Sequence, residues 1–189
     1  MKKLFLIILL GALSACVSNP SANYNVMQTV ENGRLVPQAG TGIAIVSLTF
    51  TTLDRDTAEA DLQIDGVNGR TALKARLPSD YIRSQSNDAD PMGRVFVVSL
   101  PAGNYALSRV VGNWLMHGSG ERNYVNVETN KPFSIKAGEV VYLGEVHLDM
   151  NFQSTVQYKQ NSTRDFHHVQ RRHDVTDFSN VKNQLLGSQ

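Results

Sequence analysis

The stretch Gly42-Ile43-Ala44-Ile45-Val46-Ser47-Leu48-Thr49-Phe50 decides the fold class of this chain. Many of its residues are β-branched, the type that fits a pleated strand best. From Gly40 onward the apolar pattern has a period of two residues, which is typical of strands and not of helices. The stretch therefore predicts a β-strand within a β-rich domain.

Similar segments recur along the chain, separated by turns rich in Gly, Pro and Asn. Further strands are predicted over residues 60–67, 70–77, 94–100, 105–111, 140–148 and 152–158, with a short one at 124–127 and a last one near 166–173. The apolar density of 94–100 indicates burial on both faces. Long loops are expected over residues 80–93 and 112–130.

The last residues change period. Phe178, Val181, Leu185 and Leu186 lie at helical spacing, Thr176 or Asp177 can cap the start, and Gly187 can end the helix. We therefore predict a mainly β domain over residues 40–189, a single antiparallel β-sandwich with a short C-terminal helix.

The N-terminus has three parts, which are basic residues 1–3, an apolar run over 4–10 and small residues over 11–15. This order is that of a secretory signal peptide. The apolar run is too short for a membrane span, which needs about 20 residues. Residues 1–15 are therefore predicted to be a signal peptide.

Leu13-Ser14-Ala15-Cys16 resembles the lipobox of bacterial lipoproteins. The resemblance implies cleavage between Ala15 and Cys16, a diacylglyceryl group on the Cys16 thiol and a further acyl chain, such as palmitate, on the new amine. Val17 stands where an Asp favours retention in the inner membrane, so the resemblance implies an outer-membrane lipoprotein. The alternatives are an ordinary signal peptide that leaves a free Cys16 and an uncleaved anchor helix.

Residues 16–39 are predicted to be the lipidated cysteine and a flexible tether, because Ser, Asn, Pro and Gln dominate them. Cys16 is the one cysteine of the sequence, so the domain must be stable without a disulfide. The net charge is +1, and loss of Lys2 and Lys3 changes it to 1 − 2 = −1. A near-neutral chain is not expected to bind nucleic acid by charge.

Two segments resemble prealbumin-like (transthyretin-like) β-sandwich domains found in a family of uncharacterised bacterial lipoproteins. They are Leu100-Pro101-Ala102-Gly103-Asn104-Tyr105-Ala106-Leu107 and the strand pair from Phe133 to Gly144. Pro101 and Gly103 suit a tight turn, and Tyr105 can pack inward with its hydroxyl at the edge. The resemblance implies the fold and no activity.

Four histidines are candidate metal ligands, namely His147, His167, His168 and His173. A metal site requires ligands that converge on one point. On a strand, His167 and His173 share a face but lie too far apart to bind one ion. A solvated polar strand is the simpler interpretation, and no cofactor is expected.

Trp114, Leu115 and Met116 lie in the predicted loop between glycines. Such a loop can bind a partner or reach toward a membrane. The alternative is that these side chains fold back and cover one end of the sandwich.

No nucleophile–base or acid–base constellation is visible, and no G-x-S-x-G motif occurs. We therefore expect no enzyme. The expected function is non-enzymatic binding or an envelope-structural role, with the membrane and an envelope protein or glycan as partners. The alternatives are a histidine-based metal-binding protein or metalloenzyme and an accessory lipoprotein of a secretion apparatus.

Overall fold

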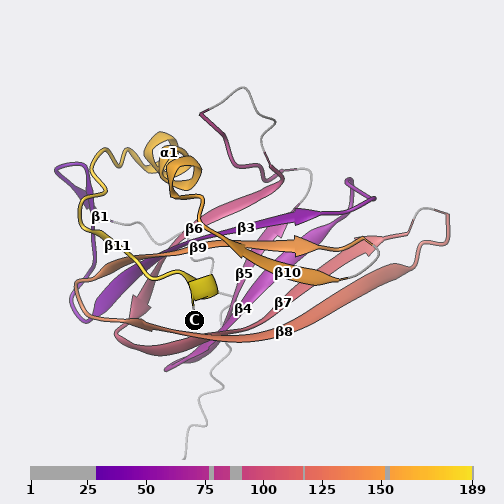
Figure 1. The fold of residues 1–189 in the computed structure, drawn as a ribbon, viewed down its shortest axis with the longest axis horizontal. Helices are drawn as coiled ribbons and strands as arrows, with labels where there is room; N and C mark the ends of the chain where they lie inside the picture. Colours follow the sequence, from indigo (N-terminus) through magenta and orange to yellow (C-terminus); the bar gives the residue numbers. More distant parts are fainter. Residues whose placement is uncertain (1–28, 77–78, 86–90, 117, 152–153, 189) are drawn as a thin grey trace, which may run out of the picture.

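The computed structural model describes residues 29–76, 79–85, 91–116, 118–151 and 154–188, and this part of the chain is mainly β (Figure 1). The strands are β1 (Thr29–Glu31), β2 (Arg34–Val36), β3 (Thr41–Thr51), β4 (Glu59–Gly66), β5 (Gly69–Arg76), β6 (Gly93–Pro101), β7 (Gly103–Leu115), β8 (Arg122–Ile135), β9 (Val140–Asp149), β10 (Thr155–Lys159) and β11 (Val181–Asn183). The helices are α1 (Ser162–His173) and a short 3-10 helix, η1 (Leu186–Ser188).

Two sheets carry the domain. One has the order β5-β4-β7-β8 and is antiparallel throughout. The other has the order β10-β9-β3-β6, and β11 adds to β9. In this second sheet β3 and β11 both run parallel to β9, so the sheet is mixed and the expectation of a purely antiparallel sandwich is wrong.

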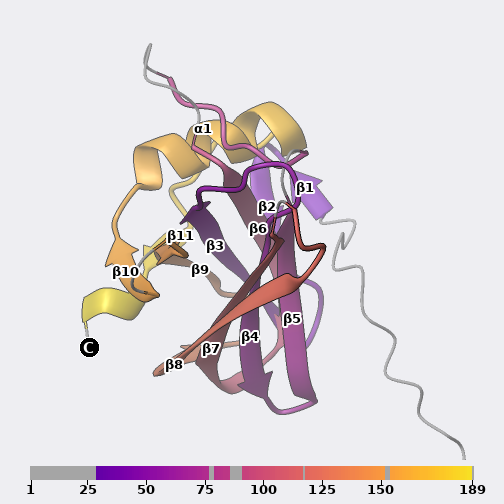
Figure 2. The same cartoon turned by 90° about the vertical axis from the view of Figure 1, so that its right-hand side faces the viewer.

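The larger hydrophobic core lies between the two sheets, which form two layers in Figure 2. Strand β3 contributes one face to it, and β4, β7 and β8 contribute from the opposite sheet. The β3 residues on this face are Ala44, Val46, Leu48 and Phe50, all buried. Side chains on this face alternate along β3 with side chains on the other face, as the period of two predicts.

The other face of β3 lies beneath an outer layer formed by the β1–β2 hairpin, α1 and residues 175–185 (Figures 1 and 2). Ile43 and Ile45 enter a second core there, together with Leu35, Tyr142 and Val169. The sheet is therefore covered on both faces, which is why β3 is buried over nearly its whole length.

A β-bulge at Gly144 decides which side chains of β9 face this outer layer. The register with β3 shifts between Ile45 and Val46, and Gly144 has φ of 91°. Val141 and Leu143 point to the inner core before the bulge, whereas Val146 and Leu148 do so after it. The extra residue thus turns Glu145 toward the outer layer, opposite Ser47 of β3.

The structure differs from the tether predicted over residues 16–39. Residues 29–36 form the β1–β2 hairpin, and Leu35 is buried in the second core. Thr176 and Asp177 donate backbone hydrogen bonds to the Gly33 carbonyl and fix the hairpin. The burial of Leu35 and these hydrogen bonds order residues 29–36 despite their polar surroundings in the sequence. Residues 16–28 of the predicted tether lie outside the described residues.

The helix lies at a different place from the predicted one. The last predicted strand, near Phe166–His173, is part of α1, because Asp165 and Val169 are four residues apart and share the buried helical face. The predicted helix from Phe178 to Leu186 is wrong: Val181–Asn183 form β11, and only the short 3-10 helix η1 begins at Leu186. Phe178 stacks on Phe166, whereas Val181 pairs with β9, so their spacing of three residues does not reflect a shared helical face.

The predicted loop over residues 112–130 is also wrong for most of its length. β7 and β8 continue through it as one long hairpin, with Gly112 opposite Val125 and Leu115 opposite Arg122. The tip lies at the right of Figure 1. The sequence did not predict these strands because glycine and polar residues interrupt the alternation of apolar and polar side chains there.

Candidate ligand-binding cleft

A cleft of about 680 Å³ lies between the C-terminal half of α1, strand β6 and the segment before β6. Arginine and histidine side chains dominate its polar lining, and Asp80 is its one acidic lining residue in the described part of the chain. The lining residues are Ser79, Asp80, Tyr81, Arg83, Gly93, Arg94, Val95, Phe96, Val97, His168, Arg171, Arg172 and His173.

Helix α1 supplies Arg171, Arg172 and His173 from its last turn. The C-terminus of a helix carries a partial negative charge that favours cations at this position. Asp174 ends the helix in the left-handed conformation, with φ of 55°, and its N–H donates to the Gln170 carbonyl at 3.1 Å. The helix therefore holds the two arginines on one turn at the mouth of the cleft.

Strand β6 forms the opposite wall. The Arg94 guanidinium lies 5.4 Å from the centre of the Phe96 ring, a cation–π distance. At the start of the strand, Gly93 approaches β3 so closely that a Cβ would lie 2.1 Å from the Leu48 carbonyl oxygen. No larger residue fits there without moving the edge of the wall.

Residues 79–83, which lie before β6, contact the rest of the domain at several positions. The Asp80 carboxylate accepts the Arg76 N–H at 2.9 Å, and Tyr81 forms a bridge with Met92. Ile82 is buried in the second core. The Arg83 N–H donates to His168 Nδ1 at 3.2 Å, so this wall is joined directly to α1.

The four candidate histidines do not converge. His168 and His173 line the cleft, His167 contacts Gln85 with 3.3 Å between Nδ1 and Nε2, and His147 lies on β9 beside Thr49. Within the described ranges, no group of three His, Cys, Asp or Glu side chains is arranged to hold a metal ion.

Beneath the other half of α1 lies a buried polar network that the sequence did not reveal. Asp165 is fully buried, and its Oδ2 accepts the hydroxyls of Ser47 and Tyr142, each at 2.7 Å. Its Oδ1 accepts from Arg164 Nε at 2.9 Å and Nη2 at 2.7 Å. Burial raises the pKa of Asp165, while these donors and the Arg164 charge oppose the rise.

Glu145 completes this network. Its carboxylate lies 3.2 Å from Arg164 Nη1 and accepts hydrogen bonds from Thr49 and Asn161. Burial would raise the pKa of Glu145, but these donors and the Arg164 charge outweigh it and lower that pKa. The network fastens α1 to the sheet. None of its members is among the described residues that line the cleft.

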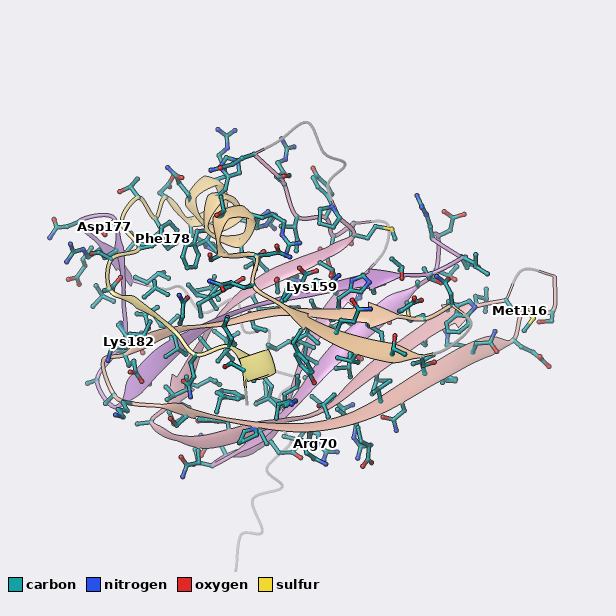
Figure 3. All side chains as sticks on the ribbon, in the orientation of Figure 1. Arg70, Met116, Lys159, Asp177, Phe178 and Lys182 are labelled. Carbon is teal, nitrogen blue, oxygen red and sulfur yellow. The ribbon has the colours of Figure 1, made fainter. Side chains whose placement is uncertain are left out.

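Trp114, Leu115 and Met116 separate in the structure. Trp114 packs against the larger core, and the Leu115 N–H donates to Thr57 Oγ1 at 2.8 Å. Met116 is exposed at the hairpin tip, at the opposite end of the molecule from Asp177 and Phe178 near the end of α1 (Figure 3). Trp114 and Leu115 are half-buried, so Met116 is the most exposed of the three side chains.

Ala15 and Cys16 lie outside the described residues. No helix within the part of the chain that the structure covers is long and apolar enough to cross a membrane.

No protein-family model matches the sequence, and no curated protein matches it. A leucine-rich repeat protein from Bacteroides thetaiotaomicron, known from a crystal structure, is similar over 60% of this chain and 14% of its own, with 11% identity and a TM-score of 0.33. A likeness this weak supports no conclusion about fold or function.

Proposed function

We propose that this chain is an outer-membrane lipoprotein, cut between Ala15 and Cys16 and anchored by lipid on Cys16. The order of basic, apolar and small residues before the cysteine supports this proposal. Two or more acyl chains give stable attachment, and each buried CH₂ contributes about 0.8 kcal/mol.

We further propose that the fold is a prealbumin-like sandwich. The segment from Leu100 to Leu107 supports it, since it forms the β6–β7 turn and the Tyr105 hydroxyl donates to the Pro101 carbonyl at 2.7 Å. The Tyr105 ring also stacks on Phe133, with 5.4 Å between the ring centres.

The function we propose for the domain is non-enzymatic binding at the cleft beside α1, with an envelope glycan as the ligand. The observation that carries this proposal is the cleft itself, whose arginines project from fixed elements around a space suited to a small organic group. An envelope protein is the alternative ligand. The histidine-based metal site has no converging ligands in the described residues to support it, and no described feature favours a secretion-apparatus role.

The anchor is tested by feeding labelled palmitate to cells that make the protein or its Cys16→Ser variant. We expect label on the wild-type protein and none on the variant. Label on Cys16→Ser at the wild-type level would overturn the anchor.

Binding at the cleft is tested by crosslinking in intact cells. We expect a crosslinked species that is lost in the double variant R171A/R172A. The matched control R70A/K182A also removes two positive charges, but from surfaces away from α1 (Figure 3), and it should keep the species. Equal crosslinking by all three proteins would show that the ligand binds elsewhere.

A further inference from the structure

The cleft beside α1 carries a strong excess of positive charge. Among the described residues, Arg83, Arg94, Arg171 and Arg172 line it, against the one lining carboxylate of Asp80, so the formal charge of this described lining is 4 − 1 = +3 with neutral histidines. The Asp80 carboxylate is already engaged by the Arg76 N–H. An anionic group is therefore the ligand chemistry that this lining favours.

We infer that the cleft takes a phosphate monoester carried on a polar organic molecule such as a sugar. This inference rests on the proposed binding function and names the chemistry of its ligand. A phosphate monoester carries a charge of about −1.5 to −2 near neutral pH and offers three acceptor oxygens. Guanidinium groups match that geometry with paired N–H donors.

Two adjacent arginines argue for a dianion over a carboxylate. Arg171 and Arg172 are exposed and stand on one helical turn, so two forks can share one phosphate, whereas a carboxylate has two oxygens and a single charge. Arg83 and Arg94 also make contacts inside the protein. We therefore assign the phosphate contacts to Arg171 and Arg172, while Arg83 and Arg94 add to the positive electrostatic potential of the cleft.

The helix dipole acts against the anion, because the C-terminus of α1 carries about half a negative charge. Two full positive charges in the last turn exceed this half charge. The dipole lowers the affinity, and it also keeps the cations in place when the cleft is empty.

The size of the cleft indicates that phosphate is only one part of the ligand. A volume of about 680 Å³ lies within the range for small organic ligands, which is about 300–1,000 Å³. Tyr81, 46% exposed, also lines the cleft, and the Arg83 guanidinium lies 5.6 Å from its ring centre and donates to its hydroxyl at 3.2 Å. This pair places an aromatic ring beside polar N–H donors, which suits a sugar ring with its apolar and polar edges.

The test is calorimetric titration of the full-length mature protein, purified in detergent, with glucose 6-phosphate. Glucose and glucuronate serve as probes without phosphate, and inorganic phosphate as a probe without sugar. We expect glucose 6-phosphate to bind about tenfold or more tightly than glucose or glucuronate, and inorganic phosphate to bind more weakly than the sugar phosphate. Binding should weaken as salt is added, because the contacts are ionic.

In R171A/R172A we expect the affinity for glucose 6-phosphate to fall about tenfold or more, which corresponds to about 1.4 kcal/mol or more. The variant R171K/R172K keeps the charge and loses the forked geometry, so its affinity for glucose 6-phosphate should lie between that of the wild type and that of R171A/R172A. R70A/K182A should bind as the wild type does. An unchanged urea midpoint in each variant shows that the fold is intact.

A second arm separates the sources of the phosphate. Phosphatidylcholine vesicles carrying a phosphorylated diglucosamine lipid test a membrane headgroup, and glucose 6-phosphate tests a soluble sugar phosphate. Arginine-dependent binding in either arm supports the phosphate chemistry and identifies the source. Equal affinity for glucose and glucose 6-phosphate, together with no vesicle binding, overturns it. If the cellular crosslink still depends on Arg171 and Arg172 in that case, the binding function stands and only the ligand class is wrong.

Discussion

Asp165 is the residue on which the attachment of α1 depends most. Its carboxylate receives hydrogen bonds from β3, from β9 and from its own helix, while solvent is excluded. Removing one partner of a buried charge pair commonly costs about 3–5 kcal/mol, since the other partner stays buried without compensation.

The Asp165→Ala variant should therefore lose about 3–5 kcal/mol in its free energy of unfolding, measured by urea denaturation. The control is Asp177→Ala, which removes a carboxylate from an ion pair with Arg34 at the surface. It should shift the midpoint far less than Asp165→Ala does. A wild-type midpoint for Asp165→Ala would mean that the network does not hold the helix.

His147 gives a prediction about acid. Burial lowers its pKa below the ordinary value of 6.5, and the Lys159 charge adds to this effect, against opposite contributions from Glu145 and Asp149. The unfolded chain therefore binds the proton more readily than the folded one, so stability falls as the pH drops below about 6.5. Urea midpoints between about pH 7.5 and pH 5.5 should fall less steeply in His147→Gln than in the wild type. A steeper fall in the variant would contradict the assignment.

Among the elements, β9 depends on its bulge. Gly144 has φ of 91°, and a Cβ there would lie 2.9 Å from the Lys159 carbonyl oxygen. Gly144→Ala should cost about 1–3 kcal/mol, the range for a strained backbone conformation, with the steric contact as an added cost. The control Gly138→Ala has a similar φ of 77° and nothing within 4 Å, so a loss as large as that of Gly144→Ala would argue against the contact.

The β1–β2 hairpin gives a second test of an element. Leu35 is 1% exposed and belongs to the second core. Leu35→Ala should cost about 2–5 kcal/mol, as expected when a large buried side chain leaves a cavity. Val36→Ala, at the half-buried neighbouring position, should cost less. A flexible tether would predict no effect from either change.

The strands that carry the larger core could be predicted because their alternation is local. Residues 42–50, 60–66, 70–76, 94–100 and 140–148 of the predicted strands all lie in observed strands, and residue 77 lies outside the described residues. The outer layer could not be predicted in the same way. Leu35, Phe166 and Val181 each find partners distant in the sequence, and their local patterns suggested a tether, a strand and a helix instead.

The cleft could not be predicted for a related reason. The sequence predicts a strand near residues 166–173, and a strand places the neighbouring side chains of Arg171 and Arg172 on opposite faces. As the last turn of a helix, the same residues project together beside β6. A spacing of four residues between Asp165 and Val169 was the signal that could have indicated the helix.

At the scale of the whole molecule, two parts of the described surface are candidates for binding. One is the cleft beside α1, and the other is the β7–β8 tip, where Met116 is exposed and Tyr124 on β8 is 70% exposed. Helix α1 and the β7–β8 tip lie apart along the long axis of the domain (Figure 1). If the proposed function is right, a ligand contacts the cleft and need not contact the tip.

Photo-crosslinking in living cells tests this choice, with a benzophenone amino acid placed at Tyr81 or at Tyr124. Tyr81 lines the cleft, and Tyr124 lies near the tip. We predict a light-dependent adduct from position 81, lost when R171A/R172A is introduced, and none from position 124. An adduct from position 124 alone would contradict binding at the cleft.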